Sequence, residues 1–400
     1  MKWEKVKLGD IATCIQPGPF GSQLHNSDYS KEGTPIIMPK DIVGGAIVHS
    51  GLLKVSEEHV KRLSRHQVYE GNLMVARKGD VRKCAYITAN ENGWMTGSDC
   101  LKVVLDESKC YPKFIYYQLR SEHIGRWLEK VSIGATMPSL NTGLLSGIEM
   151  VLPPIEIQKQ IAGILSVYDD LIENNQKQIK LLEEAAQRLY KEWFVDLRFP
   201  GYENTKIVDG VPEGWNEKTL SQVADVIMGQ SPKSEFYNSE KKGLPFHQGV
   251  GSYGVRFVMD DIYSTSYTRI AEPNSILFSV RAPVGRLNIT KNKVVIGRGL
   301  AAINQTDGCQ SYLYYLLKNK FFKDNIVGNG SIFASVSKDE LLNQKFLIPE
   351  RNLMMQFEKI VSQMDKQIEN LDSKNKKLIE ARDRLLPKLM SGEVEDQNEI

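Results

Sequence analysis

The feature that most constrains this chain of 400 residues is an internal duplication. From Gly134 onward, residues of one kind recur at a constant spacing of 196 positions, over more than fifty residues. A constant offset over such a length indicates two copies of one structural unit rather than chance. The matched pairs are Gly134 with Gly330, Pro153 with Pro349, Gln160 with Gln356, Asp169 with Asp365, Ile172-Glu173-Asn174 with Ile368-Glu369-Asn370, and Arg188-Leu189 with Arg384-Leu385.

The earlier part of each copy is less constant. Trp3 and Leu8 recur as Trp215 and Leu220, but the offset there is larger and slips by one or two residues further along. The offset between the copies is constant in the helical parts and drifts in the globular parts. This pattern predicts two globular domains, each followed by a long helix. The predicted segments are a first domain (1–152), a central helix (153–195), a linker (196–214), a second domain (215–348), a distal helix (349–390) and an acidic tail (391–400) that we expect to be disordered.

Each predicted helix carries an apolar stripe whose spacing alternates between four and three residues, which is the heptad pattern of a coiled coil. The first stripe comprises Ile157, Ile161, Ile164, Tyr168, Leu171, Asn175, Gln178, Leu182, Ala185 and Leu189. The second comprises Leu353, Phe357, Ile360, Met364, Ile368, Leu371, Leu378, Ala381 and Leu385, with the polar Asn375 in mid-stripe and with Pro387 and Gly392 predicted to mark the end of the helix.

An apolar stripe must be buried, and the simplest partner is the other copy. Two helices separated by a domain pair most easily in antiparallel fashion. The predicted fold is therefore α+β: two globular domains joined by two long antiparallel helices, with approximate two-fold symmetry. The alternative is that each helix packs separately on its own domain.

Composition restricts the function. The net charge is only +2, so any nucleic-acid contact must come from local patches or from a complex. No apolar run is long enough for a membrane span, and charges occupy the N-terminus where a signal peptide would need an apolar core. The five cysteines are odd in number and include no Cys-x-x-Cys pair, so we expect reduced thiols and a cytoplasmic location.

Two local features could contact nucleic acid, because basic side chains neutralise phosphates and small polar side chains allow close approach. One is a basic run after a predicted strand in each domain, and the other is a polar loop before each long helical region; alone, either could be an ordinary solvated surface. The candidate DNA-binding residues are Arg77, Lys78, Arg82, Lys83, Thr136, Ser139 and Asn141 in the first domain, and Arg281, Arg286, Arg298, Ser331 and Ser335 in the second. Residues 273–306 hold five basic residues and no acidic one.

The sequence lacks the motifs of an enzyme that acts on DNA. It has no Gly-Lys dipeptide and hence no phosphate-binding P-loop. Its single Pro-Pro pair, at Pro153, lacks the flanking residues with which an adenine-N6 methyltransferase holds a flipped base. Glu240-Lys241-Lys242 matches half of a nuclease metal site but has no supporting element, and the six histidines show no metal-ligand spacing. We therefore expect no catalytic residue and no metal site.

The chain resembles the specificity subunit of type I restriction–modification systems over nearly its whole length. The motifs that carry the resemblance are the Trp3 and Trp215 domain openings, the runs Leu277–Gly285 and Met74–Val81, the junctions Val151–Gln158 and Leu347–Pro349, and the ending Lys388–Glu393.

This resemblance implies that each domain is a target recognition domain for one half of a bipartite sequence in double-stranded DNA. It implies helices that act as a spacer and as a docking surface for two methyltransferase subunits, which restriction (motor) subunits join. S-adenosylmethionine, ATP and Mg²⁺ would belong to those partners, and this chain would bind no cofactor. The residues assigned to spacing and docking are Ile161, Tyr168, Asn175, Leu182, Leu189, Phe357, Met364, Leu371, Leu378 and Leu385. Two alternatives remain: the DNA-recognition subunit of a methylation-only defence system, and a coiled-coil scaffold with no role on DNA.

Overall fold

The computed structural model describes residues 3–134, 138–321 and 335–391. The chain divides into two compact units, and each contains one globular domain and half of each long helix. Unit 1 comprises Met1–Asn174 and Lys374–Ile400, and unit 2 comprises Asn175–Ser373. No helix of the described residues is long and apolar enough to cross a membrane.

The two long helices are α5, Ile155–Phe194, and α9, Arg351–Ser391. Both lie close to their predicted ranges, and Pro153 and Pro154 directly precede α5. The last described residue of α9 is Ser391, directly before Gly392, in agreement with the predicted end of this helix, but Pro387 lies inside the helix rather than ending it. A proline so close to the end of a helix removes few backbone hydrogen bonds, which makes it easier to accommodate than one in mid-helix.

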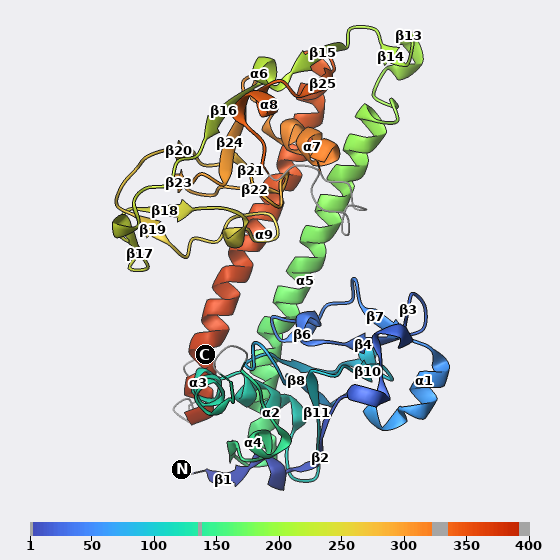
Figure 1. The fold of residues 1–400 in the computed structure, drawn as a ribbon, viewed down its shortest axis with the longest axis vertical. Helices are drawn as coiled ribbons and strands as arrows, with labels where there is room; N and C mark the ends of the chain where they lie inside the picture. Colours follow the sequence, from blue (N-terminus) through green and yellow to red (C-terminus); the bar gives the residue numbers. More distant parts are fainter. Residues whose placement is uncertain (1–2, 135–137, 322–334, 392–400) are drawn as a thin grey trace. The chain divides into compact units, whose positions relative to one another are not determined.

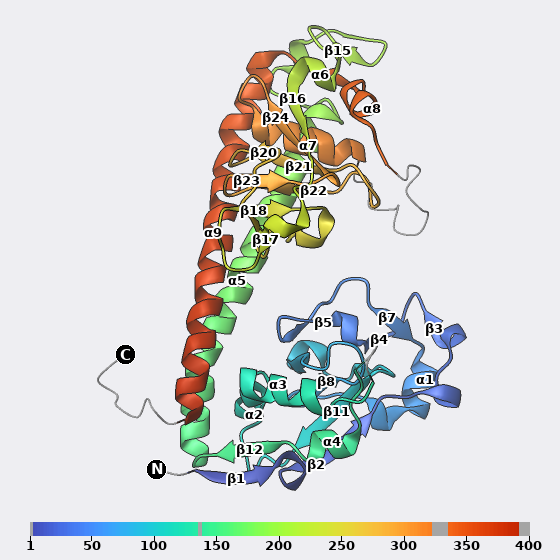
Figure 2. The same ribbon diagram turned by 60° about the vertical axis from the view of Figure 1, so that its left-hand side comes forward.

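Within each unit the two helices are antiparallel. In unit 2, the end of α5 lies beside the start of α9 (Figure 1). Tyr190 and Trp193 of α5 pack there against Phe357 of α9. In unit 1, the first half of α5 lies beside the end of α9 (Figure 2). Asp169 of α5 forms an ion pair of 2.6 Å there with Arg382 of α9. The predicted antiparallel pairing is thus present in both units.

The seam of α5 differs from the predicted one at every second position. Leu171, Gln178 and Ala185 were expected in the seam but are exposed, and their next neighbours Ile172, Ile179 and Ala186 face inward instead. The predicted stripe ran 161, 164, 168, 171, whereas the buried one runs 161, 165, 168, 172. Both patterns repeat every seven residues, and the buried one is the more apolar. In α9 the same shift buries Val361 in place of Ile360.

The domain of unit 1 is built on the four-stranded antiparallel sheet β2-β11-β8-β9, with a second sheet, β10-β4-β7-β3, beside it. Strand β1 pairs with β12, which leads into α5. The elements are β1 Glu4–Lys7, β2 Ala12–Pro17, β3 Tyr29–Ser30, β4 Thr34–Ile37, β5 Ile42–Val43, β6 Ala46–Ile47, β7 Leu53–Val55, α1 Glu57–Arg62, β8 Leu73–Ala76, β9 Cys84–Tyr86, β10 Met95–Thr96, β11 Cys100–Leu105, α2 Pro112–Leu119, α3 Glu122–Val131, α4 Thr142–Ser146 and β12 Glu149–Leu152.

The domain of unit 2 is built on the corresponding sheet, β16-β24-β21-β22, and on a five-stranded sheet, β17-β19-β18-β23-β20. Strand β15 pairs with β25, which leads into α9. The elements are β13 Ile207–Val208, β14 Val211–Pro212, β15 Asn216–Thr219, α6 Leu220–Val223, β16 Ala224–Met228, β17 Tyr237–Asn238, β18 Leu244–His247, β19 Tyr263–Ser264, β20 Ile270–Ala271, β21 Ile276–Ser279, β22 Leu287–Ile289, β23 Val294–Ile296, β24 Leu300–Gln305, α7 Gln310–Phe321, α8 Lys338–Leu342 and β25 Lys345–Ile348.

The duplication therefore extends through the globular domains, where sequence identity is weak. The main sheets have the same strand order, and each second sheet contains one parallel pair, β4 with β10 and β18 with β23, among antiparallel ones. Strand β20 is added in unit 2, where unit 1 has only the isolated bridge of Gln67 with Met95. The predicted α+β class, with two domains and two long helices, is confirmed.

The helical region that follows β11 consists of two helices, α2 and α3. The chain breaks at Arg120, and Ser121 starts a new helix, α3, by accepting a hydrogen bond from the backbone N–H of Ile124. The Ser-Glu pair at 121–122 is a typical helix start. In unit 2 the corresponding region holds α7, which begins at Gln310.

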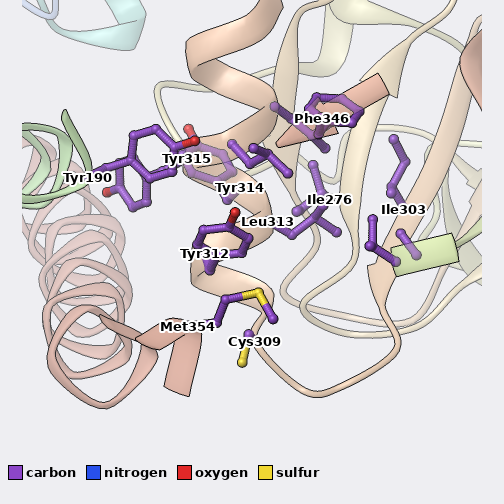
Figure 3. Packing of buried hydrophobic residues seen from close by; sticks show 14 of the residues in the cluster. Tyr190, Ile276, Ile303, Cys309, Tyr312, Leu313, Tyr314, Tyr315, Phe346 and Met354 are labelled. Carbon is purple, nitrogen blue, oxygen red and sulfur yellow. The ribbon is translucent and has the colours of Figure 1, made fainter. Parts of the chain in front are cut away.

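Each domain is fastened to the long helices through a buried core. In unit 2, Tyr190 of α5 and Tyr312 of α7 pack with Phe357. The two tyrosines belong to the same buried cluster as Ile276 and Ile303 of the main sheet (Figure 3). In unit 1, Ile161 and Leu165 of α5 and Leu386 and Leu389 of α9 share a core with the main sheet. This packing joins each domain and its stretches of helix into one compact unit.

Candidate nucleic-acid interface

The two features predicted to contact nucleic acid lie side by side in unit 1. The backbone N–H of Leu140 donates to the carbonyl of Arg77 over 2.8 Å, and Lys78 forms a bridge with Ser139. The basic run that follows β8 is thus paired with the polar loop that precedes α4, although some sixty residues separate them in the chain.

Unit 2 has the same arrangement. The backbone N–H of Val336 donates to the carbonyl of Val280 over 2.8 Å, and Arg281 forms a bridge with Ser335. The run after β21 therefore pairs with the segment before α8, and Lys78 and Arg281 occupy equivalent positions. We name these two surfaces the unit 1 edge (Arg77, Lys78 and Ser139) and the unit 2 edge (Arg281, Ser335 and Arg298).

A close glycine contact fixes a third loop beside each edge. A Cβ atom on Gly18 would lie 1.9 Å from the carbonyl oxygen of Gly97, and one on Gly229 would lie 2.2 Å from that of Gly297. No side chain fits at such distances, so these positions require glycine. In unit 1 the loop that begins at Gly18 is held against the segment just before β11, and in unit 2 the loop that begins at Gly229 is held against the segment just before β24. The carbonyl of Asp99 in the first segment accepts the backbone N–H of Arg77, and that of Gly299 in the second accepts the backbone N–H of Val280.

The basic side chains of the unit 1 edge have different surroundings. Lys78 forms an ion pair of 3.1 Å with Asp99. The guanidinium of Arg77 lies over the ring of Phe20, 5.4 Å from its centroid, and no ion pair is found for Arg77 among the described residues. Phe20 was not identified from the sequence, although its place in a Gly-Pro-Phe-Gly turn after a strand is a signal for an exposed side chain.

Arg82 and Lys83 are tied to other parts of unit 1. Arg82 is hydrogen-bonded to Glu122, lies 3.5 Å from Glu129, and packs on α3. The hydrogen bond with Glu122 raises the pKa of the Arg82 guanidinium, although partial burial opposes this. Lys83 donates to the carbonyl of Pro39 over 3.2 Å. The charge of Arg82 is therefore partly compensated by carboxylates of the same domain.

The segment 273–306, free of acidic residues in the sequence, acquires acidic partners in the fold. Lys291 forms an ion pair of 2.6 Å with Asp372 of α9, and Lys293 forms one of 2.9 Å with Glu272. The two lysines are thus compensated. The three arginines of this segment, Arg281, Arg286 and Arg298, are exposed.

Ser279 shapes the loop that carries Arg281 and Arg286. Its buried hydroxyl donates to the carbonyl of Pro283 over 2.6 Å and accepts the backbone N–H of Arg286 over 2.8 Å. This closes a compact turn after β21 and leaves the side chains of Arg281 and Arg286 exposed. The backbone N–H of Arg298 donates to the hydroxyl of Ser231 in the glycine-anchored loop.

The polar candidates differ in what they do. Ser335 is exposed and Ser139 half-buried, both at the edges. The amide oxygen of Asn141 accepts the backbone N–H of Leu144 over 2.8 Å, so Asn141 caps α4, and Ser337 caps α8 at the equivalent place. A capping side chain already has a structural partner, which explains why this polar residue lies here. Thr136 and Ser331 lie outside the described residues.

The residues assigned to spacing and docking lie mainly inside the units. Phe357 and Leu371 are almost fully buried, and so is Ile161. Tyr168, Leu182, Leu189, Met364, Leu378 and Leu385 are half-buried, and Asn175 is buried. These side chains pack within the chain itself and hold the long helices against the rest of each unit. Little of their surface is left for a partner to contact.

The described residues contain no group of three or more histidine, cysteine, aspartate or glutamate side chains that could hold a metal ion. Four of the five cysteines are buried, and burial raises the pKa of Cys84 and Cys110 to about 12. What the two edges can provide is exposed guanidinium, hydroxyl and backbone groups, which are the groups that contact phosphates and base edges.

Comparisons with known proteins agree with this geometry. The family model described as the type I restriction modification DNA specificity domain matches residues 1–184 and 212–381. A provisionally assigned type I restriction enzyme specificity subunit, MjaX of Methanocaldococcus jannaschii, is 28% identical over 404 residues, which cover 98% of this chain and 93% of the relative. The HindI specificity subunit of Haemophilus influenzae is 22% identical over 472 residues, covering 98% and 99%.

Among solved structures, the type I restriction-modification S subunit from M. genitalium superposes with a TM-score of 0.57 at 18% identity, over 97% of this chain and 96% of the other. This likeness concerns the fold. The family model covers well over half of the chain and matches it twice, at the two copies of the repeat. The chain therefore belongs to the type I restriction–modification DNA specificity family, with two copies of its specificity domain.

Proposed function

We propose that this chain recognises a split DNA target, one half-site through each edge, and performs no chemistry on the DNA itself. The observation that carries the proposal is the recurrence of one construction at both edges with different side chains. The backbone pairing is the same in the two units, yet Arg77 and Lys78 of the unit 1 edge correspond to Val280 and Arg281 of the unit 2 edge.

Equal scaffolds with unequal side chains are what two different half-sites require, because base edges are distinguished by the donors and acceptors that contact them. Arginine can bond a guanine through two donors at once, and serine and backbone groups can position the DNA through its phosphates. The low net charge of +2 fits a subunit whose partners contribute part of the affinity.

The proposal extends to partners. Methyltransferase subunits would bind this chain and bring the catalytic site, S-adenosylmethionine and base flipping, while motor-nuclease subunits would bring ATP and Mg²⁺. Two methyltransferase subunits, one for each copy of the repeat, would place one active site on each strand. Supporting this division of roles, neither the sequence motifs nor the described residues provide a nucleotide-binding loop or a metal site.

The experiment that tests the function is selection of bound duplexes from a random library by the full chain with its methyltransferase subunits. The expected outcome is one enriched motif of two short conserved parts separated by a fixed number of unconserved base pairs. Affinity should also fall steeply with salt, because phosphate contacts release counterions. Enrichment of no motif, with weak binding that is the same for all duplexes, would favour a scaffold without a role in recognition.

A further inference from the structure

Phe20 is an exposed aromatic side chain in the glycine-anchored loop of unit 1. It is 53% exposed, although burying such a ring in the core would stabilise the fold. The loop is anchored two residues earlier, where the backbone N–H of Gly18 donates to the carbonyl of Cys100 over 3.0 Å and Gly97 blocks any side chain on Gly18. The position of Phe20 beside the unit 1 edge is therefore a product of the fold.

One face of the Phe20 ring is covered. The guanidinium of Arg77 lies over it, 5.4 Å from the ring centroid, a geometry that cation–π attraction favours. The backbone of Arg77 is held on both sides, by Asp99 over 2.7 Å and by Leu140 over 2.8 Å. A ring with one covered face offers a single apolar surface to a ligand. Insertion between two stacked bases would need both faces free, so the geometry favours contact with an apolar group at the edge of a base.

The unit 2 edge has no aromatic ring at the position equivalent to Phe20, where the sequence has Ser231. Eleven positions separate Gly18 from Tyr29, the first residue of β3, whereas eight separate Gly229 from Tyr237, the first residue of β17. The loop of unit 1 is thus three residues longer, and Phe20 lies in it. The corresponding loop of unit 2, residues 230–236, contains one aromatic residue, Phe236, which directly precedes β17 and stands seven positions after Gly229, whereas Phe20 stands two positions after Gly18.

The apolar group that a base presents in the major groove is the C5-methyl of thymine, and phenylalanine is among the side chains that pack against it. We propose that Phe20 determines specificity in one half-site by packing its free face on the methyl group of a thymine, with Arg77 holding the ring from behind. This inference rests on the proposed DNA recognition at the unit 1 edge. It assigns a thymine contact to one half-site only.

The test uses the full chain with its methyltransferase subunits and duplexes that carry its selected bipartite target. Each thymine of the target is replaced in turn by deoxyuridine, which removes only the methyl group. For the wild-type chain, one replacement in one half-site should weaken binding about fourfold, the factor expected for a single buried CH₂-sized group. For Phe20→Ala, binding to the thymine duplex should be weaker by at least that factor, and the same replacement should have no further effect.

Tyr69→Ala is the matched control, because Tyr69 is a half-exposed aromatic residue of the same unit. Tyr69 precedes strand β8, whereas Arg77 of the unit 1 edge follows that strand. Binding by this variant should remain sensitive to the methyl group. Unchanged recognition of the other half-site by Phe20→Ala would show that the variant is folded.

Three outcomes would overturn the inference. The first is a selected target without thymine in either half-site, and the second is equal binding affinity of Phe20→Ala and the wild type. The third is that, at every thymine, the loss of affinity caused by deoxyuridine is the same for Phe20→Ala as for the wild type. In each of these the chain still selects a bipartite motif, so recognition itself stands. If no motif is selected, the proposed function fails and this inference fails with it.

Discussion

Arg281 is the basic residue whose surroundings most favour a contact with DNA. Its side chain is exposed, its backbone is held by the bridge to Ser335, and no ion pair is found for it among the described residues. Lys293, in the same domain, forms an ion pair with Glu272. The free energy that a long cationic side chain contributes to DNA binding depends on whether a carboxylate already neutralises it.

The first prediction follows from this contrast. Arg281→Ala should weaken recognition of one half-site by about 1–3 kcal/mol and leave the other half-site recognised as before. Lys293→Ala removes an equal charge from the same unit and should leave the selected motif unchanged. Motif selection with both variants checks this, and an unaltered affinity and motif for Arg281→Ala would refute the assignment.

Local sequence could identify the basic residues but not their partners. Arg82 was predicted to bind DNA because four basic residues stand within seven positions. Its ion-pair partners Glu122 and Glu129 lie 40 and 47 residues further along the chain. Lys291 likewise meets Asp372 on α9. Such pairs depend on how helices pack on the sheet, and a window of seven residues carries no information about that.

At the scale of elements, one buried arginine in each unit fastens a long helix. In unit 1, Arg382 of α9 bonds Asp169 of α5 over 2.6 Å, and Tyr117 of α2 donates to the same carboxylate over 2.8 Å. In unit 2, Arg256 of the domain, only 2% exposed, bonds Asp365 of α9, the repeat equivalent of Asp169. The duplicated aspartate thus serves the same purpose with arginines from different elements.

The second prediction concerns this contact. Asp169→Asn should lower the free energy of unfolding of unit 1 by about 2 kcal/mol, because it removes the less exposed of the two carboxylates that pair with the largely buried guanidinium of Arg382. Asp383→Asn is the control, since Asp383 bonds the same Arg382 over 2.8 Å but its side chain is 56% exposed against 26% for Asp169. Its loss should cost less than about 1 kcal/mol. Urea unfolding of the two variants gives the comparison, and equal losses would contradict the account.

The elements themselves were largely predictable, with errors that have physical causes. Heptad spacing predicted both long helices correctly. In α5, however, the same spacing fits two apolar seams that share every second position and differ by one residue at the others. The presence of Gln178 in one and of Ile179 in the other favours the seam that the structure has. The break between α2 and α3 is not visible in the apolar spacing, which continues across it, although Ser121 followed by Glu122 is a helix start.

At the scale of the whole molecule, the two units share one topology, whereas the sequence revealed the repeat mainly in its helices. Sheet order, the parallel strand pairs and the close glycine contacts recur in both domains. These features depend on backbone geometry, which tolerates many side chains. The loops at the edges differ in length and chemistry, and this is where two different half-sites would require variation.

The third prediction concerns the gap between the half-sites, which we propose the long helices determine. Each helix belongs partly to unit 1 and partly to unit 2. Four residues inserted near Gln176 of α5, with four more near Ser373 of α9 to keep the pair matched, add about 6 Å of helix. The recognised gap should lengthen by about two base pairs, or recognition should be lost because the units are also rotated. An insertion in α5 alone serves as the control and should abolish recognition. Motif selection that returns the original gap for the double insertion would refute this role of the helices.

The central claim is that this chain alone determines which split sequence its complex modifies. The most direct measurement is a map of modified adenines in genomic DNA from cells with and without the gene. The account predicts one bipartite motif whose adenines are modified when the gene is present and unmodified when it is deleted, with Arg281→Ala altering one half of the motif. A modification pattern that is the same with and without the gene would contradict it.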